Sequence, residues 1–153
     1  MHVKSITEWF DEYSESHQNP TNKAIHWICV PTILFSIIGI LAHFSTLLTT
    51  LLLVLTLIFY ARLDLVLAIA MAALLVVMAW LIMVLPVGVG FYIALFVFAW
   101  IGQFYGHKVE GKKPSFFKDL QFLLIGPAWC MDAYLAKIFP KWNSRQHLKL
   151  IQY

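Results

Sequence analysis

From about residue 24 to residue 104 the chain carries only two charged residues, Arg62 and Asp64, and both lie between apolar runs. Charged side chains are costly inside a bilayer, whereas the helices of a water-soluble protein need a polar face. With 61% hydrophobic and only 12% charged residues, the composition also excludes a water-soluble core. We therefore expect a polytopic membrane protein of the all-α class, in which residues 1–153 form a single membrane domain.

Four apolar runs are predicted to cross the membrane as helices, since a hydrocarbon layer of roughly 30 Å needs about 20 apolar residues. They cover about residues 24–44, 45–60, 65–85 and 89–105. Pro31 is expected to kink the first of these helices. An even number of spans places both ends of the chain on one side of the membrane.

Three shorter segments are predicted to be interfacial helices, at about residues 5–16, 115–125 and 128–139. The first has acidic residues around apolar ones at helical spacing, which is typical of an amphipathic surface helix. The apolar stretch near the C-terminus is interrupted by charged residues, and Gly126 and Pro127 are expected to break it. We therefore predict two interfacial helices there and not a fifth span.

The distribution of basic residues indicates the orientation. Lys4, Lys23, Arg62 and every lysine or arginine from Lys108 onward fall on the side of the two termini. By the positive-inside rule this side, with both termini, is cytoplasmic, in the endoplasmic reticulum or the bacterial inner membrane. No basic helix with interleaved aromatic residues is present, so nucleic acid is excluded as a partner.

The predicted topology brings two polar stretches together. HQNPTNKAIH, from His17 to His26, leads into the first span, and QFYGHKVE, which begins at Gln103, ends the fourth. If the last helix continues past its apolar run, Gln103, His107 and Glu110 share one face. Imidazole and carboxylate groups suit iron, zinc or manganese. The candidate metal ligands and catalytic residues are therefore His17, His26, His107 and Glu110, with Asn22 and Gln103 beside them.

Each of these residues also has a local explanation. His17 can cap the surface helix, His26 can form a hydrogen bond at the interface, and Glu110 can pair with Lys108 or Lys113. Spacing alone does not separate this interpretation from a metal site. A zinc hydrolase stays open as well, because His-rich sites with one open position also support hydrolysis.

Two motifs in this order resemble one membrane family. The first is H-x-N-P-x-N-x-x-x-H-x-x-x-V-P from His17 through Pro31, and the second is Q-x-x-G-H-x-x-E-x-x-x-P from Gln103 through Pro114. Together they are similar to the family of the fungal protein of phytosphingosine metabolism that yields odd-numbered fatty acids, long catalogued as a domain of unknown function. The resemblance covers nearly the whole chain.

The resemblance implies an Fe(II)-dependent dioxygenase that shortens long-chain 2-hydroxy fatty acids by one carbon with O2, and without 2-oxoglutarate. This reaction is an α-oxidation. The protein would carry it out in the membrane, with membrane lipid as its other partner. His17, His26 and His107 would be the iron ligands, and Glu110 a fourth ligand or a neighbour that supports them. Asn22 and Gln103 would orient the site or the substrate, and Lys23, Lys108 or Lys112 would attract the anionic head. The alternatives are a zinc-dependent membrane lipid hydrolase and a non-enzymatic lipid-binding or scaffold protein with structural histidines.

Overall fold

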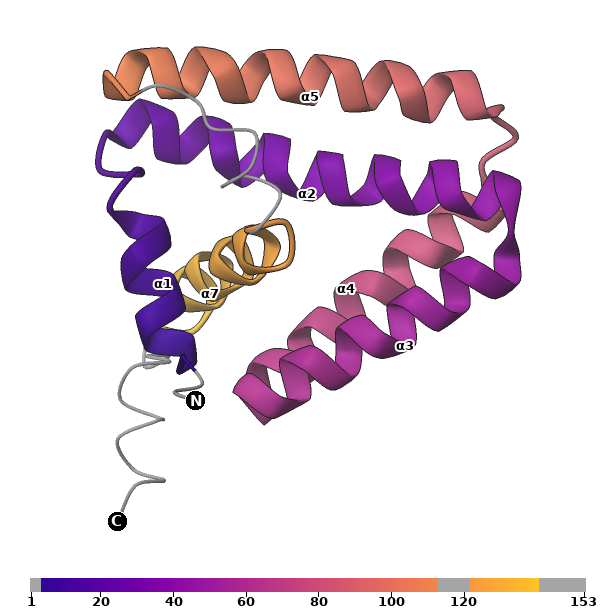
Figure 1. The fold of residues 1–153 in the computed structure, drawn as a ribbon, viewed down its shortest axis with the longest axis horizontal. Coiled ribbons are helices and arrows are strands. Elements are labelled where there is room, and N and C mark those ends of the chain that lie inside the picture. The colour runs from indigo at the N-terminus through magenta and orange to yellow at the C-terminus, as the bar shows by residue number, and fades with distance from the viewer. Residues whose placement is uncertain (1–3, 113–121, 141–153) are drawn as a thin grey trace.

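A computed structural model describes residues 4–112 and 122–140. Within these ranges the chain forms helices and no strand, so the predicted all-α class is confirmed (Figure 1). The helices are α1 (Ile6–Ser14), α2 (Pro20–Phe44), α3 (Thr46–Leu63), α4 (Leu65–Val84), α5 (Val89–Glu110) and α7 (Ile125–Ile138).

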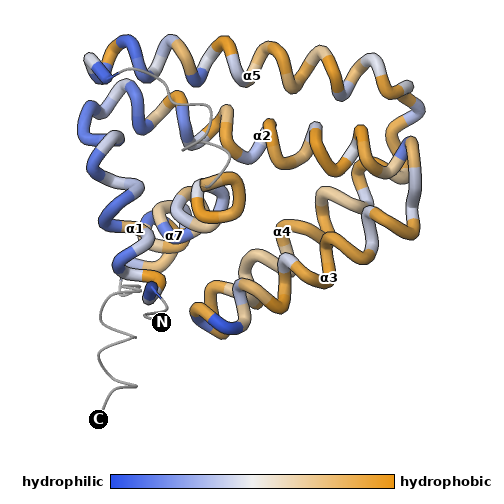
Figure 2. The backbone as a smooth tube through the Cα atoms, viewed as in Figure 1, coloured by the Kyte–Doolittle hydropathy of each residue, from blue (hydrophilic) through white to orange (hydrophobic). Residues whose placement is uncertain are grey.

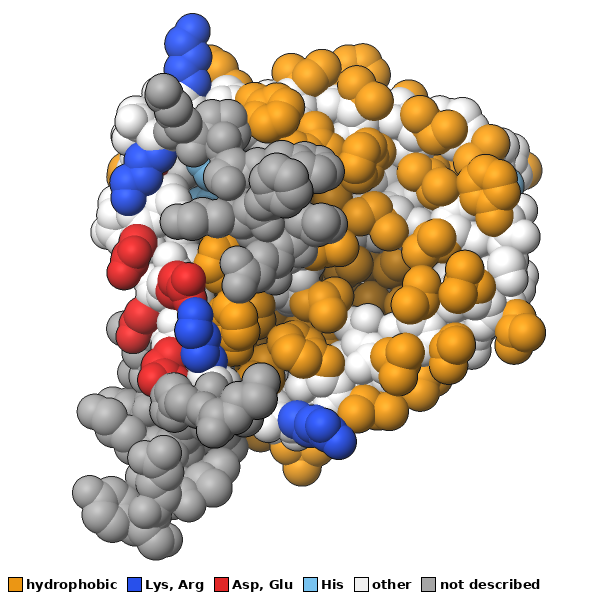
Figure 3. Space-filling model, in the orientation of Figure 1, with side chains coloured by type: hydrophobic (Ala, Val, Ile, Leu, Met, Phe, Trp, Pro, Cys, Tyr) orange, Lys and Arg blue, Asp and Glu red, His pale blue; other side chains and the backbone are white. Residues whose placement is uncertain are grey.

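Four of these helices, α2 to α5, are long and apolar enough to cross a membrane. The antiparallel helices α2 and α5 lie side by side, and α3 and α4 form a second antiparallel pair (Figure 1). Hydrophilic residues gather in α1, at the beginning of α2, at the end of α5 and at the turn between α3 and α4 (Figure 2). Between these ends the surface facing the viewer in Figure 3 is covered largely by hydrophobic side chains. By length and composition the chain is therefore an integral membrane protein.

Single polar residues join the long helices. Ser45 ends α2 and caps α3, where its hydroxyl accepts a hydrogen bond from the Leu48 backbone N–H. Asp64 ends α3 and caps α4 in the same way, and its carboxylate accepts from the N–H of Leu67 at 2.7 Å. Short polar side chains satisfy the first backbone donors of a helix, which explains why Asp64 interrupts the apolar sequence.

The helices at the polar end extend beyond the apolar runs. Asn19 caps α2 and accepts a hydrogen bond from the Thr21 N–H at 2.9 Å, and Pro20 occupies the first turn. At the same end of the pair, α5 continues five residues past residue 105 to Glu110, and Gly111 after it adopts a left-handed conformation with φ of 75°. Helix α2 runs without a break through Pro31, the residue at which a kink is predicted.

The predicted break at Gly126 and Pro127 is wrong. Both residues lie in the first turn of α7, which begins at Ile125. A proline in the first turn does not break a helix, because its missing N–H has no carbonyl to reach there. Most of the helix expected over residues 115–125 lies outside the described residues.

A hydrophobic core joins α1, α7 and the lower part of the α3–α4 pair. Its buried members are Ile6, Phe10, Tyr13, Tyr60, Leu67, Ala68, Met71, Phe122, Ile125 and Ala128. Through this core α7 packs on α1 and α4, and it also contacts α2. The packing holds the end of α1 next to the beginning of α2 and the end of α5, where the candidate site lies.

Candidate metal centre

Three histidines from distant parts of the sequence meet at the polar end of the α2–α5 pair. His17 lies between α1 and α2, His26 in α2 and His107 in α5, and each is less than 5% exposed. One ring nitrogen of each lies within 4.8 Å of those of the other two. Among the described residues this is the group of ligand-type side chains that could hold a metal ion. Three imidazole nitrogens at this spacing can bind one transition metal ion.

The hydrogen bonds of two rings fix which nitrogen is protonated. Nδ1 of His17 lies 2.6 Å from the carbonyl oxygen of Tyr13, and Nδ1 of His26 lies 3.0 Å from that of Asn22. Because a carbonyl only accepts, each Nδ1 carries the hydrogen and each Nε2 keeps a lone pair. Neither Nε2 has a hydrogen-bond partner within the part of the chain that the structure describes, although both are buried. A metal ion would satisfy these two lone pairs, so the donor set fits one.

The protonation state of His17 also suits a ligand. Burial lowers the pKa of this imidazole from 6.5 to about 4, against the opposing effect of its hydrogen bond to the Tyr13 carbonyl. The ring is therefore neutral near pH 7. Neutral imidazole is the form that binds metals.

Packing from α1 and α7 holds His17 in place. The Tyr13 ring stacks on the His17 ring, with centroids 4.2 Å apart and planes 9° apart. Trp129 of α7 lies beside both rings, and its indole N–H donates to the Ser14 hydroxyl at 3.0 Å. Helix α7 thus fixes the end of α1, from which His17 follows.

Glu110 binds the connector between α1 and α2. One carboxylate oxygen accepts a hydrogen bond from the Gln18 backbone N–H, and the other accepts from the Asn19 backbone N–H and the Asn22 side chain, each at 2.9 Å. The structure thus places Glu110 outside the group of three histidines. Its carboxylate ties the end of α5 to the connector that carries His17.

Asn22 and Gly106 bring α5 close to α2. The Asn22 side chain is fully buried and donates to the Ser16 carbonyl at 3.1 Å as well as to Glu110. A Cβ atom at Gly106 would lie 2.4 Å from the Asn22 amide oxygen and 3.2 Å from the His26 ring. The missing side chain therefore allows the close approach that sets His107 beside His26.

The other predicted site residues differ in burial. Gln103 is buried one turn before His107, whereas Lys23 is half-buried and Lys108 is exposed. Lys23 lies three residues before His26 in α2, and Lys108 directly follows His107 in α5. Both lysines are therefore at the polar end of the molecule.

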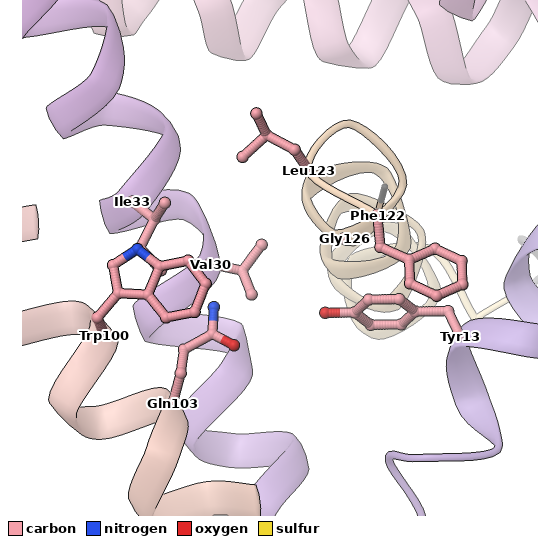
Figure 4. Close-up of a pocket in the computed structure, with 8 residues that line it drawn as sticks. All are labelled: Tyr13, Val30, Ile33, Trp100, Gln103, Phe122, Leu123 and Gly126. Atoms are coloured by element: carbon pink, nitrogen blue, oxygen red, sulfur yellow. The ribbon is translucent and has the colours of Figure 1, made fainter. Parts of the chain in front are cut away.

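A cavity lies close to the histidines along α2 and α5, and Figure 4 shows the residues that line it. Its lining includes Val30, one turn after His26, Gln103, one turn before His107, and Tyr13, which stacks on His17. Its volume is about 30 Å³, and it is partly open to the outside. The remaining lining residues are Ile33, Trp100, Phe122, Leu123 and Gly126.

Sequence reasoning missed the residues that support the histidines. Tyr13 lies in the interfacial helix predicted over residues 5–16, where the sequence gives no sign of its contact with His17, and nothing in the sequence marks Trp129. For Gly106, the available signal was its position directly before His107. The contacts of Tyr13 and Trp129 depend on how α7 docks, which no local pattern reveals.

Comparison with known proteins identifies the family of this chain. The sequence profile of the family described as 2-hydroxy-palmitic acid dioxygenase Mpo1-like matches residues 3–138. The chain is 36% identical over 134 residues to the 2-hydroxy-palmitic acid dioxygenase MPO1 of Saccharomyces cerevisiae, which covers 82% of this chain and 77% of the relative. No solved structure gives a significant match. On the match to its profile and the identity to the yeast protein, this chain belongs to the Mpo1-like family.

Proposed function

We propose that this protein is an Fe(II)-dependent membrane dioxygenase that shortens long-chain 2-hydroxy fatty acids by one carbon. The observation that carries the proposal is the group of three buried histidines, each with a ring nitrogen within 4.8 Å of those of the other two. Nε2 of His17 and Nε2 of His26 are buried and have no hydrogen-bond partner among the described residues. Family membership supports the choice of oxygen chemistry and of a 2-hydroxy acid, since the yeast relative is named for both.

His17, His26 and His107 would hold the metal ion. Histidine ligands with open positions suit non-haem Fe(II), which when bound supplies the redox chemistry that lets O2 react with an organic acid. Zinc has no redox chemistry and would restrict the same residues to hydrolysis. Iron is therefore the metal that matches the proposed reaction.

The overall reaction balances without a further co-substrate. A 2-hydroxy acid, RCH(OH)COOH, and one O2 give the shortened acid RCOOH, CO2 and one water. The hydroxy acid supplies all four electrons that reduce O2, so no 2-oxoglutarate is required. The product has one carbon fewer, which turns an even-numbered chain into an odd-numbered one.

The other residues of the site position its parts. Glu110 and Asn22 hold the connector that carries His17, and we assign them a positioning role. Gln103 lines the cavity beside His107, where its amide can donate a hydrogen bond to the substrate carboxylate. Lys23 and Lys108 would attract the anionic head to this end of the protein.

The same end is proposed to face the cytoplasm. Lys4, Lys23, Lys108 and Lys112 all belong to the segments around the histidines, and Arg62 lies at the α3–α4 turn. The positive-inside rule then puts the site and both termini on the cytoplasmic side of the endoplasmic reticulum or of a bacterial inner membrane.

Metal analysis and oxygen uptake test the proposal. Detergent-purified wild type is expected to hold close to one iron per chain and to consume O2 with 2-hydroxypalmitate, giving pentadecanoate and CO2. His26→Ala and His107→Ala are expected to lose both the iron and the activity. Stoichiometric zinc without O2 uptake would redirect the proposal to hydrolysis, and wild type without metal or activity would favour a lipid-binding or scaffold protein.

A further inference from the structure

We propose that the acyl chain of the substrate lies in an apolar groove between α2, α3 and α4, which it reaches from the histidines past Leu123. This inference rests on the proposed function, because it assigns the head of the 2-hydroxy acid to the three histidines. The groove would be a binding site for the acyl chain, and its side chains would select the length of that chain.

The groove is large and almost wholly apolar. Its volume is about 270 Å³, and it is partly open to the surroundings. Its lining residues are Leu34, Ile37, Ile38, Leu41, Thr49, Leu52, Leu53, Thr56, Leu75, Leu123 and Leu124. The two threonines donate their hydroxyl hydrogens to backbone carbonyls of their own helix at 2.8 Å, so they present no unsatisfied donor to a bound chain.

Leu123 connects this groove to the cavity beside the histidines. It lines both spaces, and the neighbouring residues Ile33 and Leu34 of α2 line one each. In Figure 4 the Leu123 side chain extends away from the α7 turns at the edge of the cavity. A chain that leaves the histidine site toward the membrane interior therefore passes this side chain.

The backbone around Leu123 is anchored on both sides. The Tyr60 hydroxyl of α3 donates a hydrogen bond to the Leu124 carbonyl at 2.6 Å. The Phe122 ring packs edge-to-face on the Tyr13 ring, which itself stacks on His17. A residue held between two such contacts is well suited to set the width of the passage.

The path from the histidines to the far end of the groove is about as long as one leaflet of a bilayer is thick. From Val30, beside the histidines, to Leu41, at the far end, α2 rises roughly 16 Å at 1.5 Å per residue. One leaflet of a bilayer, half of a hydrocarbon layer of roughly 30 Å, has about this thickness. Because the surrounding lipid is as apolar as the groove, the groove selects by length and shape and not by hydrophobic gain.

Chain-length profiles of Leu53→Trp and Leu123→Phe test the inference. The kcat/KM of the iron-loaded full chain is measured with 2-hydroxydecanoate, 2-hydroxypalmitate and 2-hydroxytetracosanoate. A bulky side chain inside the groove is expected to lower the long-to-short ratio of kcat/KM by about tenfold or more. Leu55→Trp is the matched control, since Leu55 lies on α3 with its side chain 53% exposed and does not line the groove. Unchanged ratios in both groove variants of an active enzyme would overturn the inference.

Photo-crosslinking gives a readout that does not need turnover. A 2-hydroxy fatty acid with a diazirine near its methyl end is expected to label groove residues of α2 and α3, and excess 2-hydroxypalmitate to prevent the labelling. Even labelling of all lipid-exposed faces would overturn the groove as a specific site. Competed labelling of the groove in a protein that consumes no O2 would keep the binding site and overturn the proposed reaction, so the two failures are distinguishable.

Discussion

Gly106 of α5 lies so close to Asn22 of α2 that a Cβ atom on it would be 2.4 Å from the Asn22 amide oxygen. Since Asn22 also donates hydrogen bonds to Glu110 and the Ser16 carbonyl, it has little freedom to move away. The spacing of the two helices at the histidine site is therefore set by the absence of one methyl group.

Gly106→Ala is expected to separate α5 from α2 and to displace His107. Overpacking of a close contact costs about 1–3 kcal/mol, and the metal should be lost before the fold. Metal content and thermal unfolding in detergent measure both effects. Gly90→Ala, in the same helix with no atom within 4 Å of its added Cβ, should keep the metal and the stability. Equal behaviour of the two variants would contradict the close-contact argument.

Glu110→Gln is expected to weaken metal binding without abolishing it. The carboxylate holds the connector through three hydrogen bonds, and outer partners of metal ligands typically contribute about 10–100-fold in affinity. Chelator competition measures the affinity, with His26→Ala as the reference for loss of a ligand. If Glu110→Gln loses metal as completely as His26→Ala, Glu110 is itself a ligand and the positioning role is wrong.

Metal addition is expected to raise the unfolding temperature of the wild type. A ligand that binds only the folded state at 100 times its dissociation constant adds roughly 2.7 kcal/mol of stability. His107→Ala should show no such increase when Fe(II) is added to the metal-free protein under anaerobic conditions. His43→Ala is the control, because His43 sits near the opposite end of α2, where its Nδ1–H donates to the Gly39 carbonyl. An equal loss of the increase in both variants would exclude a specific site.

The metal-free protein is expected to lose stability as the pH falls from about 6.5 toward 4. Burial lowers the pKa of His17 to about 4 in the folded state, so the unfolded chain binds a proton at higher pH than the folded one. The free energy of unfolding is then independent of this group above pH 6.5 and decreases below it, by up to about 3 kcal/mol. Denaturant unfolding at several pH values measures the slope. His17→Gln should make the free energy of unfolding less dependent on pH between 4 and 6.5. An identical pH dependence in the wild type and the variant would show that another group dominates.

The fold class followed from the sequence because the absence of charge inside four long runs leaves few alternatives to membrane helices. The ends of α2 and α5 were harder to predict, since residues 20–23 and 106–110 are helical but polar. Their helical state comes from the Asn19 cap and the left-handed Gly111, which hydropathy does not register. Whether Pro127 breaks a helix or lies in its first turn depends on where α7 begins, and hydropathy does not reveal that residue either.

The three histidines of the candidate site could be predicted from the sequence, but the contacts that hold them in place could not. An even number of spans sufficed to bring His17, His26 and His107 together, and the structure has their nitrogens within 4.8 Å of one another. The helical spacing of His107 and Glu110 correctly gave them a common face. It did not reveal that the connector offers backbone N–H groups to that carboxylate, because the path of the connector is set by long-range packing.

The split of the site between both ends of the chain has a consequence for biosynthesis. His17 and His26 leave the ribosome with the first span, whereas His107 follows only after the second and third spans have been made, and the α7 residues that brace His17 come later still. The nascent chain therefore holds two of the three proposed metal ligands, without His107, until the fourth span has been made. On the proposed function, the three histidines would take up their metal ion only after α5 has inserted, so metal occupancy would mark completed assembly in the membrane.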